Sequence, residues 1–204
     1  MLTIFKRVNF TFALSVAKDN TYDKIILGID PGTNISGYGV IGIKKNQLNY
    51  ISMGIFDLRS EINHAMKLQS IFDQCSKLID TYLPDEFAIE APFYGKNAQS
   101  MLKLGRAQGV SMAAALNRNI PIFEYAPRRI KQSVTGRGTA TKEQVAGMVK
   151  SLLNLETLHS KFDATDAIAI AICHYFTYKP GQDHSGTHYN NWNSFINKNP
   201  DKIK

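Results

Sequence analysis

Four acidic residues stand where apolar segments of this chain end or begin, and their placement limits what the chain can be. Asp30 ends the apolar run KIILGID, and Glu90 ends a second run, EFAIE. Asp163 and Asp166 open an alanine-rich segment, and their spacing puts both on one face of a helix. Carboxylates held close together repel one another and have raised pKa values unless cations lie between them. The pattern therefore predicts a carboxylate cluster that binds Mg²⁺, with Mn²⁺ as a substitute, because both ions prefer oxygen ligands.

Each acid also has an ordinary explanation when it is taken alone. The Asp-Pro-Gly sequence at Asp30 is common turn chemistry, and Glu90 at a strand end is typical of a surface residue. Asp163 and Asp166 are favoured at a helix N-terminus by the helix dipole. The combination indicates a site, because two strand ends and one helix face can meet at the edge of a sheet.

Hydrophobic periodicity predicts a mixed sheet that is covered by helices on both faces. The runs KIILGID, GYGVIGI and LNYISMGIFDL form an expected antiparallel meander, joined by turns rich in Gly, Asn and Lys. Two later strands, EFAIEA and PIFEY, alternate with helices and are expected to be parallel. Helices are predicted between Ser60 and Pro84, at 97–117, near 127–134, at 141–153 and at 163–177. The expected fold class is α/β with a five-stranded mixed sheet.

The length and composition predict one domain with an appendage at each end. A chain of 204 residues, 44% of them hydrophobic, can bury one sizeable core. We expect residues 24–178 to form the domain, 1–23 an extension, and 179–204 a polar, disordered tail. Lys6 and Arg7 precede the stretch VNFTFALSVA, which also resembles a short export signal. An extension is preferred because the rest of the chain is typical of an intracellular enzyme.

The two cysteines and the lack of long apolar runs predict a cytoplasmic protein. Cys75 and Cys173 fall in helical apolar patterns, without the spacing of a disulfide framework or a metal site. They are expected to be buried and reduced. No run is long enough to cross a membrane.

Positive charge is concentrated in the middle of the chain. The formal net charge is +7, and residues 91–150 contain ten Lys or Arg against two Glu, so the rest is slightly negative. A basic block beside carboxylates suits a nucleic acid held near a metal site, because phosphate contacts supply most sequence-independent affinity. A solvated basic surface explains the charge equally well when it is considered alone. The basic residues are Lys96, Lys103, Arg106, Arg118, Arg128, Arg129, Lys131, Arg137, Lys142 and Lys150.

Four segments carry a resemblance to a known family. The segments ILGIDPGTNISGYGVI, FAIEAPFYGKNAQSMLKLGRAQGV, FEYAPRRIKQSVTGRGTATKEQV and FDATDAIAIAICHY resemble the RuvC family of Holliday-junction resolvases, in register over about residues 24–178. The resemblance implies an RNase H-like fold and a homodimer. It also implies an Mg²⁺-dependent endodeoxyribonuclease that cuts two opposed strands of a four-way DNA junction.

The resemblance assigns roles to the acids. It implies that Asp30 bridges two Mg²⁺ ions, that Glu90 holds one and Asp166 the other, and that Asp163 completes the cluster. Some family members carry His at the position of Asp163, so this residue either binds metal or orients the attacking water. Lys142 is expected to stabilise charge in the transition state. No covalent enzyme intermediate is needed.

The same comparison assigns the DNA contacts. Lys131 and Lys142 match family lysines near the cut strand, and Arg137 lies in a GRG turn where the backbone can approach a phosphate. Phe93 matches a family aromatic residue at the junction crossover, where stacking a base is worth ~1–3 kcal/mol. Lys96, in the same loop, is a further candidate for DNA binding. Without the match, these residues are explained by exposed lysines, a surface turn and loop packing.

Partners and competing functions follow from the resemblance as well. The helix at 97–117 is expected to contribute to the dimer, and branch-migration motor proteins are implied partners. The string GIDPGTNISGYGV also resembles the phosphate-binding hairpin of sugar kinases and actin-like ATPases, but these clamp ATP between two such domains. A ribonuclease of the same fold that trims ribosomal RNA, and a non-catalytic junction-binding protein, are further alternatives.

Overall fold

The computed structural model describes residues 21–92 and 97–177. The predicted tail at 179–204 lies outside these residues, as does the predicted extension at 1–23 apart from its last three residues. The described strands and helices, in chain order, are β1 (Lys24–Asp30), β2 (Ile35–Lys44), β3 (Gln47–Asp57), α1 (His64–Tyr82), β4 (Glu86–Glu90), α2 (Ala98–Leu116), β5 (Ile122–Tyr125), α3 (Pro127–Thr135), α4 (Lys142–Leu152) and α5 (Phe162–Thr177).

The sheet has the predicted mixed topology. Its five strands lie in the order β3-β2-β1-β4-β5. The pairs β1–β2 and β2–β3 are antiparallel, and β1–β4 and β4–β5 are parallel. The meander forms because short turns join its strands, whereas each parallel strand needs a helical crossover. The parallel strands β1 and β4 therefore end at the same edge of the sheet.

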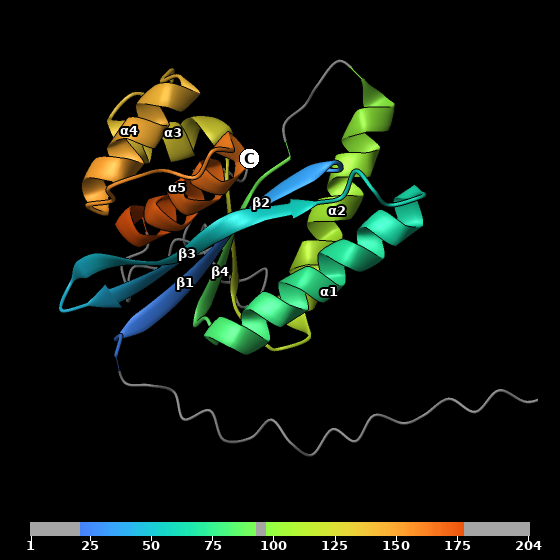
Figure 1. Ribbon diagram of the computed structural model, residues 1–204, viewed down its shortest axis with the longest axis horizontal. Helices are drawn as coiled ribbons and strands as arrows, with labels where there is room; N and C mark the ends of the chain where they lie inside the picture. The colour runs from blue at the N-terminus through green and yellow to red at the C-terminus, as the bar shows by residue number, and fades with distance from the viewer. Residues whose placement is uncertain (1–20, 93–96, 178–204) are drawn as a thin grey trace, which may run out of the picture.

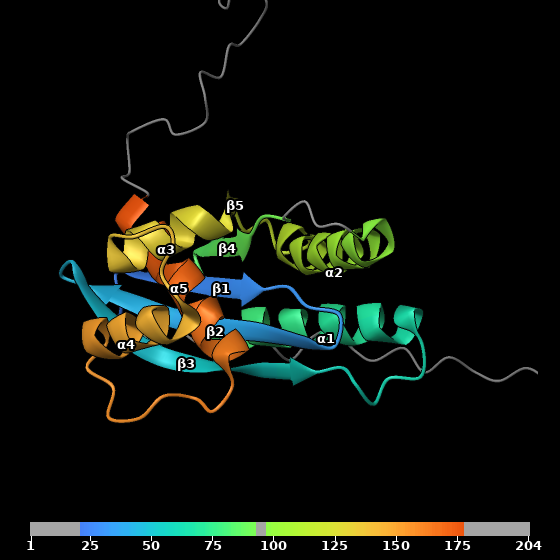
Figure 2. The ribbon, with the colours of Figure 1, turned by 90° about the horizontal axis from the view of Figure 1, so that it is seen from above.

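Helices cover both faces of the sheet. Figure 1 shows α3, α4 and α5 on one side and α1 and α2 on the other, and Figure 2 shows the same layers from above. Each face has its own apolar core. Ile168, Ile170 and Ile172 of α5 belong to the first core, and Ile71, Cys75 and Ile79 of α1 belong to the second. Strand β1 contributes to both, because its alternate residues point to opposite faces.

Local sequence determines where several helices begin and end. The Asn63 side chain caps α1 by accepting a hydrogen bond from the Met66 amide. Pro127 begins α3, where its missing N–H costs nothing, and Gly136 ends α3 with a φ of 75°. Thr141 and Gln144 form a reciprocal capping box that fixes the first turn of α4. The residue that follows Thr141 is Lys142, so this cap also positions a predicted site residue.

The predictions for fold class and core cysteines are confirmed. All five strands and all five helices lie where the sequence patterns predict them, with ends that differ by a few residues. Cys75 and Cys173 are both buried and free. Within residues 21–92 and 97–177, no helix is both long and apolar enough to cross a membrane.

Candidate active site

Two of the predicted acids lie next to each other at one edge of the sheet. Asp30 is the last residue of β1 and Glu90 is the last residue of β4. These strands are parallel neighbours whose last register pair is Ile29 with Ile89, one residue before each acid. The Asp30 and Glu90 carboxyl groups are close enough to share a hydrogen bond. The sheet topology therefore brings together two acids that are sixty residues apart in the sequence.

Helix α5 brings the other two acids to this edge because glycines let it lie directly on the sheet. A Cβ atom on Gly28 would overlap the backbone oxygen of Ala167, and one on Gly37 would overlap the backbone oxygen of Asp163. Gly37 also pairs with Asp30 across β1 and β2. The first two turns of α5, which carry Asp163 and Asp166, therefore lie beside the end of β1.

Gly37→Ala is expected to destabilise the protein by ~1–3 kcal/mol, because the added methyl group meets backbone rather than a movable side chain. Chemical denaturation followed by circular dichroism measures this change. Gly147→Ala is the matched control, since nothing lies within 4 Å of a Cβ placed there in α4. This control should gain up to ~1 kcal/mol from helix propensity. Equal stability of Gly37→Ala and the unchanged protein would contradict the close contact.

Three acids and two lysines line one cavity. The cavity has a volume of about 320 Å³ and lies where β1, β4, α3, α4 and α5 meet. Its polar lining is formed by Asp30, Glu90, Asp166, Lys131 and Lys142. Its apolar wall is formed by Pro127, Ile130, Val145, Ala169 and Ile170. A small cavity with converging charged groups and an apolar wall is typical of a catalytic site.

The acids in the cavity have perturbed pKa values. Burial raises the pKa of Asp30 well above its usual range, and the neighbouring charges of Glu90 and Asp166 raise it further. Burial also raises the pKa of Glu90. For Lys142, burial acts to lower the pKa, but the hydrogen bond and the charge of Asp166 outweigh it and the net shift is upward. The site therefore favours bound protons or bound cations over bare carboxylates.

The donor set fits a hard divalent cation. Among the described residues, no three Asp, Glu, His or Cys side chains are grouped as a ready set of metal ligands. The Lys142 ammonium instead lies 2.5 Å from Asp166 Oδ2, and Asp30 shares a hydrogen bond with Glu90. A cation would compete here with the Lys142 ammonium for Asp166. Three carboxylates facing one cavity are suitable oxygen ligands for Mg²⁺.

The remaining predicted site residues are placed less centrally or lie outside the described residues. Asp163 does not line the cavity, although its charge contributes to the raised pKa of Lys142. Arg137 also lies away from the cavity lining, in the turn after α3, where its backbone is hydrogen-bonded to Thr135. Phe93 and Lys96 fall in the segment that the structure does not describe.

A buried polar network, which the sequence analysis did not predict, anchors the C-terminal half of α5. His174 is fully buried, with its Nε2 2.8 Å from Glu86 Oε2 and its Nδ1 2.6 Å from the Tyr125 hydroxyl. The Lys24 ammonium donates to the other oxygen of Glu86 at 2.7 Å. Burial acts to raise the pKa of Glu86, but its bonds with His174 and Lys24 outweigh it and the pKa is lowered. The network joins α5 to β4 and β5 and, through Lys24, links β4 to β1.

His174→Phe is expected to lower the free energy of unfolding by ~2–4 kcal/mol, because it removes a buried hydrogen-bond partner from Glu86 and from Tyr125. Chemical denaturation at neutral pH measures this loss. Since the pKa of Glu86 is lowered by folding, the stability it contributes is present above the ordinary carboxyl pKa and is lost in acid. A loss below ~0.5 kcal/mol would show that the network contributes little.

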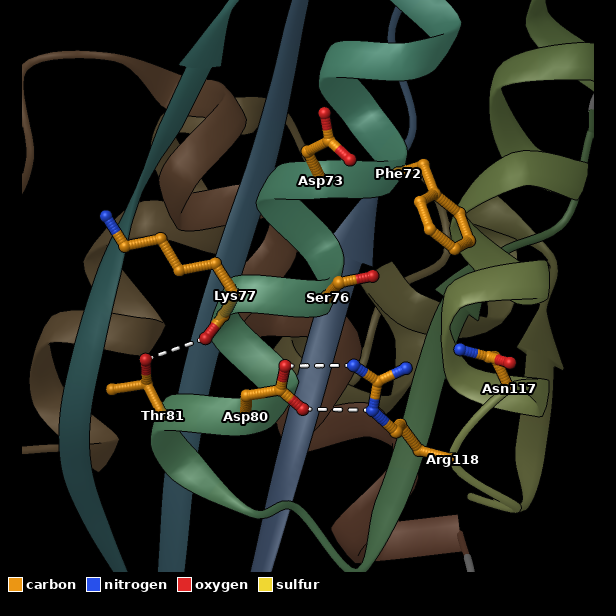
Figure 3. Close-up of a pocket in the computed structure, with 8 residues that line it drawn as sticks. All are labelled: Phe72, Asp73, Ser76, Lys77, Asp80, Thr81, Asn117 and Arg118. Atoms are coloured by element: carbon orange, nitrogen blue, oxygen red, sulfur yellow. Dashed lines mark hydrogen bonds and ion pairs between the residues drawn. The ribbon is translucent and has the colours of Figure 1, made fainter. Parts of the chain in front are cut away.

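A second hollow lies between α1 and the C-terminal end of α2, on the other face of the sheet from α5 (Figure 1). Its volume is about 540 Å³, larger than that of the acidic cavity, and its lining includes Asp80 and Arg118. Figure 3 shows these two side chains facing each other across it, and the Arg118 guanidinium donates two hydrogen bonds of 2.9 Å to Asp80. This paired geometry joins the two helices, and none of the four predicted acids lines the hollow.

A family model and several known proteins with the same description match most of this chain. The family model described as "Crossover junction endodeoxyribonuclease RuvC" matches residues 26–174, a range that contains the four acids and both cavity lysines. A relative of that name from Cytophaga hutchinsonii is 55% identical over 184 residues, which is 90% of this chain and 90% of the relative. Another from Porphyromonas gingivalis is 53% identical over 185 residues, covering 89% of this chain and 98% of the relative.

A solved structure agrees with these relatives. Thermus thermophilus RuvC in complex with a Holliday junction substrate has a TM-score of 0.70 and 28% sequence identity to this chain. The match covers 75% of this chain and 93% of that one. The predicted RNase H-like architecture is thus confirmed.

Proposed function

This chain belongs to the RuvC family of crossover junction endodeoxyribonucleases, and on that premise we propose that it resolves four-way (Holliday) DNA junctions in homologous recombination and DNA repair. The enzyme makes paired, symmetric nicks in two opposed strands. The observation that carries this proposal is the cavity in which Asp30, Glu90 and Asp166, from three different elements, meet Lys131 and Lys142.

The acids of the cavity hold Mg²⁺ in this proposal, with two ions per site and Mn²⁺ as a substitute. Asp30, Glu90 and Asp166 are the ligands, and Asp163 adds negative charge beside them or orients the attacking water. Bound Mg²⁺ supplies an activated water and neutralises charge on the departing oxygen. The raised pKa values of Asp30 and Glu90 support this assignment, because burial and the neighbouring Asp166 carboxylate disfavour their charged forms, and a bound cation would favour those forms.

The lysines act on the DNA. Lys142 is exposed over 55% of its side chain and therefore has access to an incoming phosphate. When it leaves Asp166 it can neutralise the charge that develops on the phosphate during cutting. Lys131, on the same cavity, holds the phosphate from the α3 side. Arg137, Phe93 and Lys96 are further DNA contacts in this proposal, on the basis of their match to the family.

A homodimer would place two such cavities on one symmetric junction. Helix α2 supports this proposal, because Leu102 and Leu116 on it expose 63% and 62% of their surface. Large exposed apolar side chains are common where a partner covers them. Sedimentation of the purified protein should give twice the mass of one chain.

The proposal also includes a cytoplasmic location and cooperation with branch-migration motor proteins.

The function is tested by incubating the purified protein with a synthetic mobile four-way junction, a linear duplex of the same sequence and a structured RNA. We expect paired nicks in opposed strands of the junction, which DNA ligase can seal, and only when Mg²⁺ or Mn²⁺ is present. Equal cutting of the linear duplex, preferential cutting of RNA, or hydrolysis of ATP without DNA would favour a different activity of the fold.

A further inference from the structure

We propose that Gln108 is a positioning residue that fixes the main chain of Glu90 and so determines where the Glu90 carboxylate stands in the acidic cavity. This inference rests on the proposed function, because it concerns the same three acids. Gln108 lies on α2, outside that cavity. It touches the backbone of an acid rather than the reacting groups.

The contacts of Gln108 link one helix to two strands. Its side-chain amide is buried, with 6% of the residue exposed. The Nε2 group donates one hydrogen bond to the Glu90 carbonyl oxygen at 3.3 Å and another to Glu124 Oε2 at 2.8 Å. Glu90 is in β4 and Glu124 is in β5. The two donated bonds use both N–H groups of the amide, which defines its orientation.

Glu90 needs such support because the sheet holds it from one side only. The register between β1 and β4 ends at Ile29 with Ile89, so Glu90 has no paired residue on β1. On the other side, Glu90 pairs with Tyr125, and the Ala91 amide donates to the Tyr125 carbonyl at 2.9 Å. The chain then leaves the sheet through Pro92. Gln108 supplies a restraint at this point from a different element.

The surroundings of Gln108 show that simple packing does not explain it. A small cavity of about 90 Å³ separates this part of α2 from the strand end, and its lining includes Pro31, Glu90, Pro92, Leu104 and Gln108. An apolar side chain of similar length would fill this region without the cost of burying an amide. The buried amide is satisfied by its bonds to Glu124 and to the main chain of Glu90. The second bond matters for the site, since carboxylates in a metal site must be held within ~0.5 Å of their working positions.

The test compares three variants with the unchanged protein. Gln108→Met keeps the length of the side chain and removes both hydrogen bonds. Gln108→Glu combined with Glu124→Gln keeps a hydrogen bond between these two side chains, now donated by residue 124, but leaves the Glu90 carbonyl without its donor. Ser111→Ala is the matched control: Ser111 is a buried polar residue on the same helix, and its hydroxyl donates to Ala107 within α2.

Five quantities are measured: kcat and KM for junction cutting, junction binding in Ca²⁺, Mn²⁺ binding to the DNA-free protein by calorimetry, and the melting temperature. Assays are run at about pH 8.5, where carboxyl groups of ordinary pKa are ionised. For Gln108→Met and for the double variant we expect kcat to fall about tenfold and Mn²⁺ binding to weaken several-fold, with KM and junction binding unchanged. Ser111→Ala should stay within about twofold of the unchanged protein in kcat and in Mn²⁺ affinity.

The outcomes separate the inference from the function on which it rests. If the unchanged protein does not cut junctions, the proposed function fails. If it cuts and the double variant has unchanged kcat and unchanged Mn²⁺ affinity, Gln108 does not position Glu90. If Gln108→Met and Ser111→Ala lose kcat equally in proportion to their lower melting temperatures, Gln108 contributes only to stability and the proposal is also wrong.

Discussion

Asp30→Asn is expected to abolish strand cutting and, at the same time, to raise the melting temperature of the metal-free protein. The loss of cutting should be about 10³-fold or more, because Asp30 is a central ligand of the proposed Mg²⁺ site. The gain in stability follows from the raised pKa of Asp30, which burial and the charges of Glu90 and Asp166 produce. An amide carries no charge to bury, and it can still donate a hydrogen bond to Glu90.

The size of this gain in stability depends on pH. The folded protein holds the Asp30 proton more tightly than the unfolded chain does, so stability falls as the pH rises from the ordinary carboxyl range towards the folded pKa. The advantage of Asp30→Asn should therefore be small in acid and should grow towards neutral pH, where a gain of ~1 kcal/mol raises the melting temperature by ~2–4 °C. Calorimetry in EDTA over a range of pH measures it.

A matched control uses a carboxyl group whose pKa shifts in the opposite direction. The Arg59 side chain, through its hydrogen bond, lowers the pKa of the exposed Asp57 to about 2. Asp57→Asn should therefore show no gain in stability at neutral pH and should leave cutting unchanged. If Asp30→Asn melts no higher than the unchanged protein in EDTA, or if it still cuts junctions, the assignment of Asp30 to a crowded metal-binding cluster is wrong.

Lys142→Ala has the second largest expected effect, a fall in the cutting rate of about 10²–10³-fold. Lys142 contacts Asp166 and lines the cavity beside Lys131, so it is the cation closest to the acids among the described residues of the cavity. Its removal should also reduce the salt dependence of junction binding by about one unit of slope, as expected for the loss of one phosphate contact. Single-turnover cutting and binding titrations at several salt concentrations measure both effects.

Lys77→Ala serves as the control for charge alone. Lys77 lies on α1, on the face of the sheet opposite α4, and it lines the hollow shown in Figure 3. This variant should change neither the rate nor the salt slope. An unchanged rate and slope for Lys142→Ala would remove Lys142 from both chemistry and DNA binding.

The central part of the site was predictable from the sequence. Asp30 and Glu90 end apolar runs that read as strands, and parallel strands end at one edge of a sheet, so their proximity follows from topology. The spacing of Asp163 and Asp166 correctly predicts the start of a helix at this edge. No sequence pattern indicated that Lys131 and Lys142 belong to the site. Only the family resemblance distinguished them from the other basic residues of the segment 91–150.

Other features depend on tertiary packing that no local pattern encodes. Gln108 was missed because a single Gln among small residues on a helix gives no sign of which backbone it will meet. The partners of His174 come from strands about fifty and ninety residues earlier, so no local spacing indicates these bonds. Asp163 shares a helical face with Asp166. It lies one turn closer to the N-terminus of α5, however, and does not line the cavity.

Three segments that are distant in the sequence bring their carboxylates together, and we propose that they bind divalent metal there. A crystal of the protein soaked in Mn²⁺ tests this most directly, because anomalous scattering locates the metal independently of any activity. We expect Mn²⁺ peaks bonded at about 2.1 Å to oxygens of Asp30, Glu90 and Asp166, with Lys142 displaced from Asp166. If Mn²⁺ binds in the crystal but all its anomalous peaks lie away from these three carboxylates, the proposed metal site is wrong.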